Sequence, residues 1–335
     1  MRPTLLTIGI VAACMTACQS EPFNHSNNQT GSTGSGFQTS SAGSDSSPRS
    51  AADAAGSPAA YMAGQPIRWG QLRPLFAEAI GGEVLSEVVL GRQVDRALER
   101  AGMQVTEADL EREMDLLRAA LDPDPNQAQR LINELRRREG LGPNRFEMML
   151  RRNAGLRKLV QPEVTLSEEA IRRQYQLEYG PRYEVRLIVT DTFAAAGAVK
   201  RQLAAGQSFI DLAVRHSVDE SRRQGGYLGE ISPVDASYPA AVRRQIERLG
   251  VGGVSDPIAL QRGFAIVKVE GVRPAEGVQL QQVREELTEA VRLQVEQMLM
   301  RQRARTMLQQ ADPTILDPAL KNSWDQQRRV TELMP

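Results

Sequence analysis

A change of residue pattern near position 183 constrains the fold of this 335-residue chain more than any other feature of its sequence. Before it, apolar residues recur at the spacing of amphipathic helices, as in the stripe Leu110, Met114, Leu117 and Leu121. After it, residues 183–189 read YEVRLIV, a run of branched residues that is typical of a strand. The pattern therefore predicts a helical part followed by a part that mixes strands and helices.

Capping residues mark helix boundaries in the first part. Thr106, followed by Glu107 and Asp109, predicts a helix start, and Ser167 before two glutamates predicts another. A further helix is expected from about residue 126 to the glycine at 140. Leu and Met faces of this kind usually form the core of a bundle. They could instead line a groove for unfolded chains, because methionine adapts to varied partners.

The second part predicts an α+β unit of about ninety residues. A glycine-containing loop, Gln261-Arg262-Gly263, is typical of a hairpin between its last two strands. The expected order is a strand at 183–189, helices at 192–205 and 208–216, a strand at 226–231, a helix near 238–249, and strands at 254–260 and 264–269.

The first eighteen residues read as a targeting segment. The apolar run 5–13 is too short for a mature transmembrane helix, and it precedes the only two cysteines of the chain, Cys14 and Cys18. A small residue directly before a cysteine resembles a bacterial lipoprotein signal, and Cys18 gives the more normal signal length, with Cys14 as the alternative. An ordinary secretory signal is the other interpretation. The body of the chain has no further cysteine and so no internal disulfide.

Residues 19–60 are rich in Ser, Gly, Asn, Thr and Gln and show no helical or strand periodicity. Such a composition buries too little apolar surface to offset the entropy of ordering, so we expect a flexible tether. About forty residues of this kind have a mean reach of roughly 35 Å.

Composition excludes several functional classes. The 41 basic and 41 acidic residues give a formal net charge of zero, which argues against a general nucleic-acid binder. The only histidines are His25 and His216, which leaves almost nothing for a histidine-based triad or a zinc site. No P-loop or Gly-x-Ser-x-Gly motif is present, and we expect neither a metal nor another cofactor.

The α+β segment resembles the parvulin peptidyl-prolyl isomerases over Val185–Val272. The resemblance is carried by four motifs: Gly206-x-x-Phe209-x-x-Leu212-Ala213, Ser217-x-Asp219, Gly225-Gly226-x-Leu228-Gly229 and Val254-Ser255-x-Pro257. The flanks resemble the SurA-type and PrsA-type foldases: residues 62–67 resemble the short opening segment of their chaperone domain, 85–110 its long helices, and 164–175 the helix that leads into the isomerase unit.

This resemblance implies an α+β fold in which a parvulin domain, a four-stranded antiparallel sheet with helices, is attached to an all-helical SurA-N-like chaperone domain. A C-terminal long helix is expected to complete that helical domain. The expected division is a signal peptide 1–17, a tether 18–60, a helical domain 61–180, a parvulin domain 181–273, and a C-terminal long helix and tail 274–335.

The resemblance also implies site residues. In the family, two histidines and a Cys or Asp lie under the amide, and Met, Phe and Leu form a cup for the proline ring. Asp219 falls on the Cys/Asp position, whereas the histidine positions are Arg186 and Ala265 here. The substrate-binding positions are Leu228, Tyr238, Val242, Leu260 and Phe264.

Two residues of this stretch also have plainer explanations. Asp219 could simply cap the helical turn 220–224, because aspartate accepts hydrogen bonds from free backbone N–H groups. His216 does not replace the missing histidines, and we interpret it as packing at a helix end.

The implied function is an extracytoplasmic, membrane-tethered isomerase and chaperone with an eroded isomerase site. Its partners would be unfolded or extended exported polypeptides with X-Pro segments, and the membrane through a lipid on Cys18; nucleic acid is not expected. Isomerase activity could be weak or lost, or the apolar cup together with Asp219 could be enough for catalysis. The alternatives are a non-catalytic holdase and an envelope module that docks one fixed partner.

Overall fold

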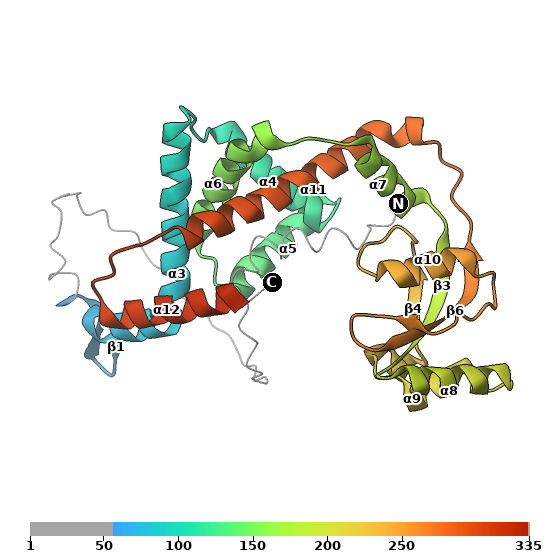
Figure 1. The fold of residues 1–335 in the computed structure, drawn as a ribbon. Coiled ribbons are helices and arrows are strands. Elements are labelled where there is room, and N and C mark those ends of the chain that lie inside the picture. The colour runs from blue at the N-terminus through green and yellow to red at the C-terminus, as the bar shows by residue number, and fades with distance from the viewer. Residues whose placement is uncertain (1–55, 334–335) are drawn as a thin grey trace. The chain divides into compact units, whose positions relative to one another are not determined.

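The computed structural model describes residues 56–333, which fall into two compact units. One unit comprises residues 56–163 and 296–333, and the other is Val164–Val295 (Figure 1). The predicted signal segment, both cysteines and residues 18–55 of the predicted tether lie outside the described residues. Within residues 56–333, none of the helices combines the length and the apolar character that crossing a bilayer requires.

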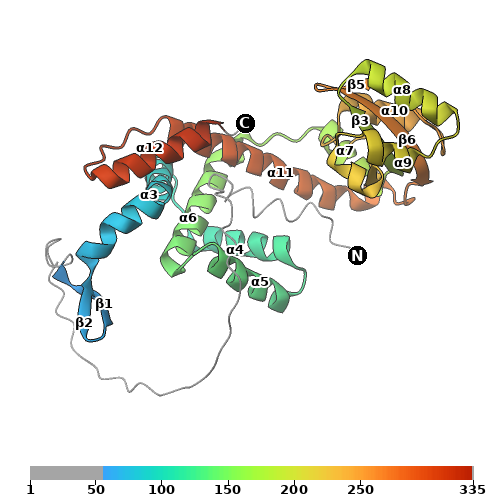
Figure 2. The ribbon, with the colours of Figure 1, turned by 90° about the horizontal axis from the view of Figure 1, so that it is seen from below.

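The first unit consists of a short hairpin and helices. Strands β1 (Pro58–Met62) and β2 (Gln65–Arg68) pair antiparallel next to the start of the first helix (Figure 2). The helices are α3 (Trp69–Arg100), α4 (Glu107–Leu121), α5 (Pro125–Arg138), α6 (Pro143–Val160), the C-terminal part of α11 (Leu280–Gln309) and α12 (Pro318–Leu333).

The hairpin departs from the predicted all-helical domain, and its first strand begins inside the segment predicted as tether. Ala63 and Gly64 both have positive φ, the geometry of a two-residue hairpin turn. Alanine rarely adopts this conformation, so the sequence carries only a weak hairpin signal here.

The predicted helix start at Thr106 is confirmed. The Asp109 N–H donates to Oγ1 of Thr106 at 3.3 Å, and the Thr106 N–H donates to Oδ2 of Asp109 at 2.8 Å. This reciprocal pair satisfies two backbone donors at the start of α4. Ser167 caps α7 (Glu168–Tyr179) with a single bond, in which its Oγ accepts from the N–H of Ala170.

The core of the first unit joins segments far apart in the chain. Leu90, Val94 and Leu98 of α3 pack against residues of α6, and Met300 of α11 belongs to the same cluster. Beside it, Arg157 of α6 is buried between two carboxylates, Glu113 of α4 and Glu296 of α11. The C-terminal part of α11 is therefore an integral element of this helical core.

Helix α12 packs on α3 at a glycine pair. The Gly82 N–H donates to Oγ of Ser323 at 2.9 Å, and the neighbouring Trp324 is buried with 4% of its surface exposed. A side chain that enters the hydrogen-bond ladder of a helix is a recognised cause of bending. Helix α3 changes direction along its length (Figure 1).

The second unit has the predicted α+β order. After α7 come β3 (Arg182–Thr190), α8 (Phe193–Ala204), α9 (Phe209–His216), a 3₁₀ turn (Glu220–Gln224), β4 (Tyr227–Ile231), α10 (Ala240–Arg248), β5 (Ile258–Ala259), β6 (Phe264–Arg273) and the N-terminal part of α11. The antiparallel sheet has the order β4-β3-β6-β5, which confirms the predicted four-stranded sheet.

The strand predicted over 254–260 is shorter than expected. Only Ile258 and Ala259 form β5, and Val254 makes an isolated bridge to Lys268. Pro257 lies between them and has no N–H to donate, which interrupts a continuous ladder.

The sheet of the second unit has two apolar faces. Helix α10 covers one face, where Val185, Leu187 and Val189 of β3 pack with Ala265 and Val267 of β6. Helices α8 and α9 cover the other, where Ile188 and Ile266 lie in a separate cluster (Figure 1). Because side chains alternate along a strand, residue parity decides which face each position reaches.

Candidate functional site

A pocket of about 640 Å³ lies in the second unit, between the segment that opens α10 and the β5–β6 hairpin. It is lined by residues 236–240 and 260–262 together with Arg243. Two predicted substrate-binding residues, Tyr238 and Leu260, lie in this wall. Both are half-buried and pack against the core cluster under α10. The structure thus brings together two residues that are 22 positions apart in the sequence.

The pocket wall supplies a hydroxyl donor as well as apolar surface. Burial raises the pKa of Tyr238, and the nearby Asp235 carboxylate contributes in the same direction. The phenol therefore stays protonated through the neutral range and can donate a hydrogen bond.

Two other predicted substrate-binding residues belong to the same cluster without lining the pocket. Val242 is 2% exposed, so it supports the wall from beneath. Leu228 of β4 is half-buried against the cluster but is not one of the pocket residues.

Phe264, the fifth residue predicted to bind substrate, does not line this pocket because of the pleat of β6. Ala265 faces α10, so Phe264 faces α8 and α9. Its ring meets that of Phe193 edge-on, with 5.5 Å between the ring centroids. Phe264 therefore lies on the opposite side of the sheet from Tyr238 and Leu260.

Arg186, assigned to a histidine position, also points away from the pocket. Its Nη1 donates to the carbonyl oxygens of Gln224 and Gly225 at 2.9 and 3.0 Å, and its Nε lies 2.8 Å from Oε2 of Glu270. Its guanidinium also lies 5.2 Å from the ring centroid of Tyr227. Arg186 thus ties β3 to the glycine turn, on the face opposite Ala265.

The residues of β3 that share the face of Ala265 are Tyr183, Val185, Leu187 and Val189. Around Ala265 this face therefore presents the apolar side chains of Leu187 and Val189, with the Tyr183 phenol farther along the strand. Alternation of branched residues in YEVRLIV is the sequence signal for this, but the pairing shifts at Val185/Arg186 and Glu184/Val185 make the register hard to read from sequence.

The stretch HSVDESRRQGG is hydrogen-bonded to the backbone of β3 through Ser217, Val218 and Gly226. Oδ1 of Asp219 accepts from the N–H of Ser221 at 2.9 Å, so Asp219 caps the 3₁₀ turn as its plainer interpretation predicts. Gly225 and Gly226 have positive φ, and a Cβ on Gly226 would collide with the carbonyl oxygen of Leu187. His216 is exposed at the end of α9, so the prediction that it packs there is wrong.

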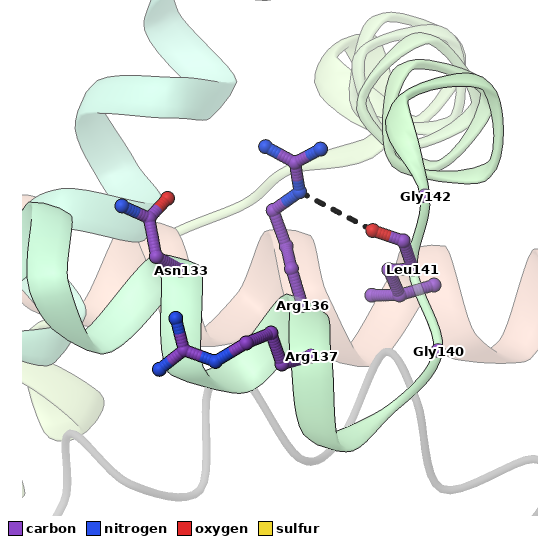
Figure 3. Close-up of a pocket in the computed structure, with 6 residues that line it drawn as sticks. All are labelled: Asn133, Arg136, Arg137, Gly140, Leu141 and Gly142. Atoms are coloured by element: carbon purple, nitrogen blue, oxygen red, sulfur yellow. Dashed lines mark hydrogen bonds between the residues drawn. The ribbon is translucent and has the colours of Figure 1, made fainter. Parts of the chain in front are cut away.

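A second pocket, of about 520 Å³, lies in the first unit where α5 turns into α6. Figure 3 shows Arg136, Arg137 and Asn133 projecting from α5 around it, with the dashed bond joining Nε of Arg136 to the carbonyl oxygen of Leu141 at 3.3 Å. The Arg136 guanidinium also lies 4.6 Å from the ring centroid of Phe146. Arginine stays protonated, so these side chains offer no acid–base pair for catalysis.

Over residues 56–333, no three His, Cys, Asp or Glu side chains converge in a way that could hold a metal ion.

Comparison with known proteins assigns the second unit to a class. Residues 166–285 match the family described as the PPIC-type PPIase domain. This part of the chain is therefore a parvulin-type domain, in agreement with the four-stranded sheet and its helices.

Two groups of curated relatives match the chain. It is 39% identical to Chaperone SurA of Burkholderia thailandensis over 85 residues, which cover 25% of this chain and 18% of that protein. It is 27% identical to Foldase protein PrsA of Clostridium botulinum over 110 residues, a third (33%) of either chain. The chain thus spans less than a fifth of the SurA relative and a third of the PrsA relative.

Solved structures are also similar. A peptidylprolyl isomerase (PrsA) from Bacillus cereus is 20% identical, with a TM-score of 0.38 over 82% of this chain and 99% of that one. The parvulin domain of PpiD from E. coli is 30% identical, with a TM-score of 0.26 over 30% of this chain and 95% of that one. The class assigned here rests on the sequence match and on the chain's own topology.

Proposed function

We propose that this chain is a foldase for exported proteins, whose parvulin unit binds X-Pro segments of unfolded polypeptides. The match of residues 166–285 to the PPIC-type domain carries this proposal. The pocket beside Tyr238 and Leu260 gives the segment a place to bind, with an apolar wall for the proline ring. The printed names of the relatives, chaperone and foldase, support the same reading.

Catalysis by this unit is weak or absent in our proposal. Rotation about an X-Pro bond crosses a barrier of about 18–20 kcal/mol, and a dry apolar site lowers it by disfavouring the polar planar amide. Polar groups near the amide would lower it further. The strand residues next to Ala265 on the pocket side of the sheet are Leu187, Val189 and Val267, none of which can donate or accept a proton.

An NMR measurement of cis/trans exchange in an X-Pro peptide tests both statements. With the processed full chain, we expect saturable peptide binding with little acceleration of exchange. Tyr238→Ala should weaken binding, whereas the control Phe193→Ala, 62% exposed on the opposite side of the sheet, should not. Absence of binding to any X-Pro peptide would refute the proposed function, and strong acceleration would refute the eroded site.

Asp219 is the remaining candidate for a catalytic role, and its capping bond complicates the test. Asp219→Asn removes the charge but keeps an oxygen that can cap Ser221, whereas Asp219→Ala removes both. If the carboxylate acts on the amide, both variants lose whatever exchange the protein catalyses. If Asp219 only caps, the asparagine variant keeps it.

The location in our proposal is extracytoplasmic, with a lipid on Cys18 holding the protein at the cell envelope. The apolar run 5–13, the two cysteines and the Ser/Gly-rich stretch 19–60 support it. Fractionation of cells producing Cys18→Ala or Cys14→Ala tests it, since only the lipidated cysteine should be needed for retention in the membrane fraction. Retention of both variants would contradict single-site lipidation.

Exposed apolar side chains favour a second function for the first unit, the holding of extended clients. Met62 is 72% exposed, and Leu75 and Phe76 near the start of α3 are 60% and 48% exposed. Exposed apolar side chains that lie close together often mark an interaction site. We expect Leu75→Ser with Phe76→Ser to reduce suppression of aggregation of a proline-free client. The control Leu316→Ser, at a residue that is 91% exposed, should leave this suppression unchanged. Equal losses of aggregation suppression in the two variants would argue against a binding site on α3.

A further inference from the structure

The pocket beside α10 is positively charged as well as apolar. Arg243 and Arg262 line it, and none of its other lining residues is acidic. Arg243 comes from α10 and Arg262 from the β5–β6 hairpin, so the two charges approach the pocket from different elements.

Arg243 is already held in position. Its Nε donates to the carbonyl oxygen of Tyr238 at 3.0 Å, and its Nη1 donates to the carbonyl oxygen of Pro233 at 3.2 Å. Both partners are neutral, so the guanidinium keeps its full charge and has N–H groups left to donate. A side chain that is ordered before binding loses less entropy when it meets a ligand.

Asp235 places one negative charge near Tyr238, but this carboxylate forms no ion pair with Arg243 or Arg262. Oδ1 of Asp235 accepts from the N–H and the hydroxyl of Ser237 at 2.9 and 2.7 Å. Among the described residues, no carboxylate lies within 4.0 Å of a guanidinium nitrogen of Arg243 or Arg262. Helix α10 also carries the charged residues Arg244 and Glu247, and neither of them lines the pocket.

We propose that the pocket selects proline segments in which an acidic side chain, Asp or Glu, stands next to the proline. This inference rests on the proposed function, because it assumes that the proline ring lies on the wall formed by Tyr238 and Leu260. A carboxylate one residue away then lies within reach of the two arginines, which bind carboxylates through charge-assisted hydrogen bonds. An unpaired basic pocket equally disfavours a lysine at that position.

The test measures dissociation constants by NMR titration of the processed full chain. The probes are alanine-based peptides that differ only in the residue beside proline, which is Glu, Gln or Lys, on either side of the ring. We expect the Glu peptide to bind about two- to tenfold more tightly than the Gln peptide, which is the range that partly exposed charge pairs give. The Lys peptide should bind more weakly than the Gln peptide. The Glu preference should shrink as salt rises from low to high concentration.

The matched variants are Arg262→Glu and Arg248→Glu, which change the net charge equally. Arg248 is exposed at the end of α10 and does not line the pocket. Arg262→Glu should remove or reverse the Glu preference, and Arg248→Glu should leave it nearly intact. Equal binding of the three peptides, or equal effects of the two variants, would overturn this inference while leaving the proposed function standing. Failure of every peptide to bind would overturn both.

Discussion

Replacing Gly82 with alanine should separate α12 from α3. A Cβ built on Gly82 would lie 2.5 Å from the carbonyl carbon of Ser323 and 2.8 Å from the backbone nitrogen of Trp324. Both atoms belong to the backbone of α12, so no side-chain rotation can relieve the contact. The helix must move away, which would also break the bond from the Gly82 N–H to Oγ of Ser323.

The expected change in unfolding free energy follows from comparing Gly82 with a second glycine of the same helix. Gly91 also lies in α3, and a Cβ there would meet no atom within 4 Å. Alanine gains roughly 0.5–1 kcal/mol over glycine inside a helix at either position. Forcing a methyl group into a close-packed contact costs about 1–3 kcal/mol. We therefore expect Gly91→Ala to be stabilising, and Gly82→Ala to be about 1–3 kcal/mol less stable than Gly91→Ala.

Tryptophan fluorescence reports this change directly. The chain has two tryptophans, Trp69 and Trp324, and both belong to the first unit. Release of α12 would expose Trp324, so Gly82→Ala should shift the emission to the red without denaturant and lower the urea midpoint followed by fluorescence. Gly91→Ala should raise that midpoint without a spectral shift. If both variants gain stability equally, the close approach of α12 to Gly82 is not what holds this helix.

Two further predictions concern charged groups of the first unit. Arg157→Met should cost about 3–5 kcal/mol of unfolding free energy in urea denaturation, because it removes the guanidinium that pairs with the buried carboxylates of Glu113 and Glu296; a cost below 1 kcal/mol would mean that the site admits water. A hydrogen bond from Lys158, with a second from the Thr106 backbone, lowers the pKa of Asp109 from 3.8 to about 2. The stability that the ionised Asp109 carboxylate contributes is therefore present above about pH 4 and is lost as the pH falls toward 2. Asp109→Asn should flatten the dependence of the urea midpoint on pH between these values. An unchanged slope would contradict the lowered pKa of Asp109.

The elements of the fold could be read from the sequence because their signals are local. Thr106 and Ser167 start helices through hydrogen bonds to residues three positions later, and such pairs are visible as short motifs. The branched run at 183–189 and the glycines at 225 and 226 predict the strand and turn that the structure contains. The hairpin at Pro58–Arg68 was not predicted, because alanine at position 63 is not a residue typical of turns.

The site was harder to predict because it depends on the side of the sheet that each residue reaches. A motif match places Arg186, Ala265 and Phe264 near one another, but the match says nothing about pleat or register. Alternation along β3 places Arg186 opposite Val185 and Leu187, on the α9 side, where its side chain binds the glycine turn. Alternation along β6 places Phe264 on that side as well.

By itself, then, the sequence determined most of the helices and strands and the parvulin-like order of the second unit, since spacing and capping act between near neighbours. Only the tertiary structure decided that Tyr238 and Leu260 share a wall, that Arg243 and Arg262 face one pocket, and that α12 closes on Gly82. Those pairings join residues 19 or more positions apart, and they depend on how sheet, helix and hairpin pack together. No local pattern encodes that packing, because it is set by the summed contacts of the whole core.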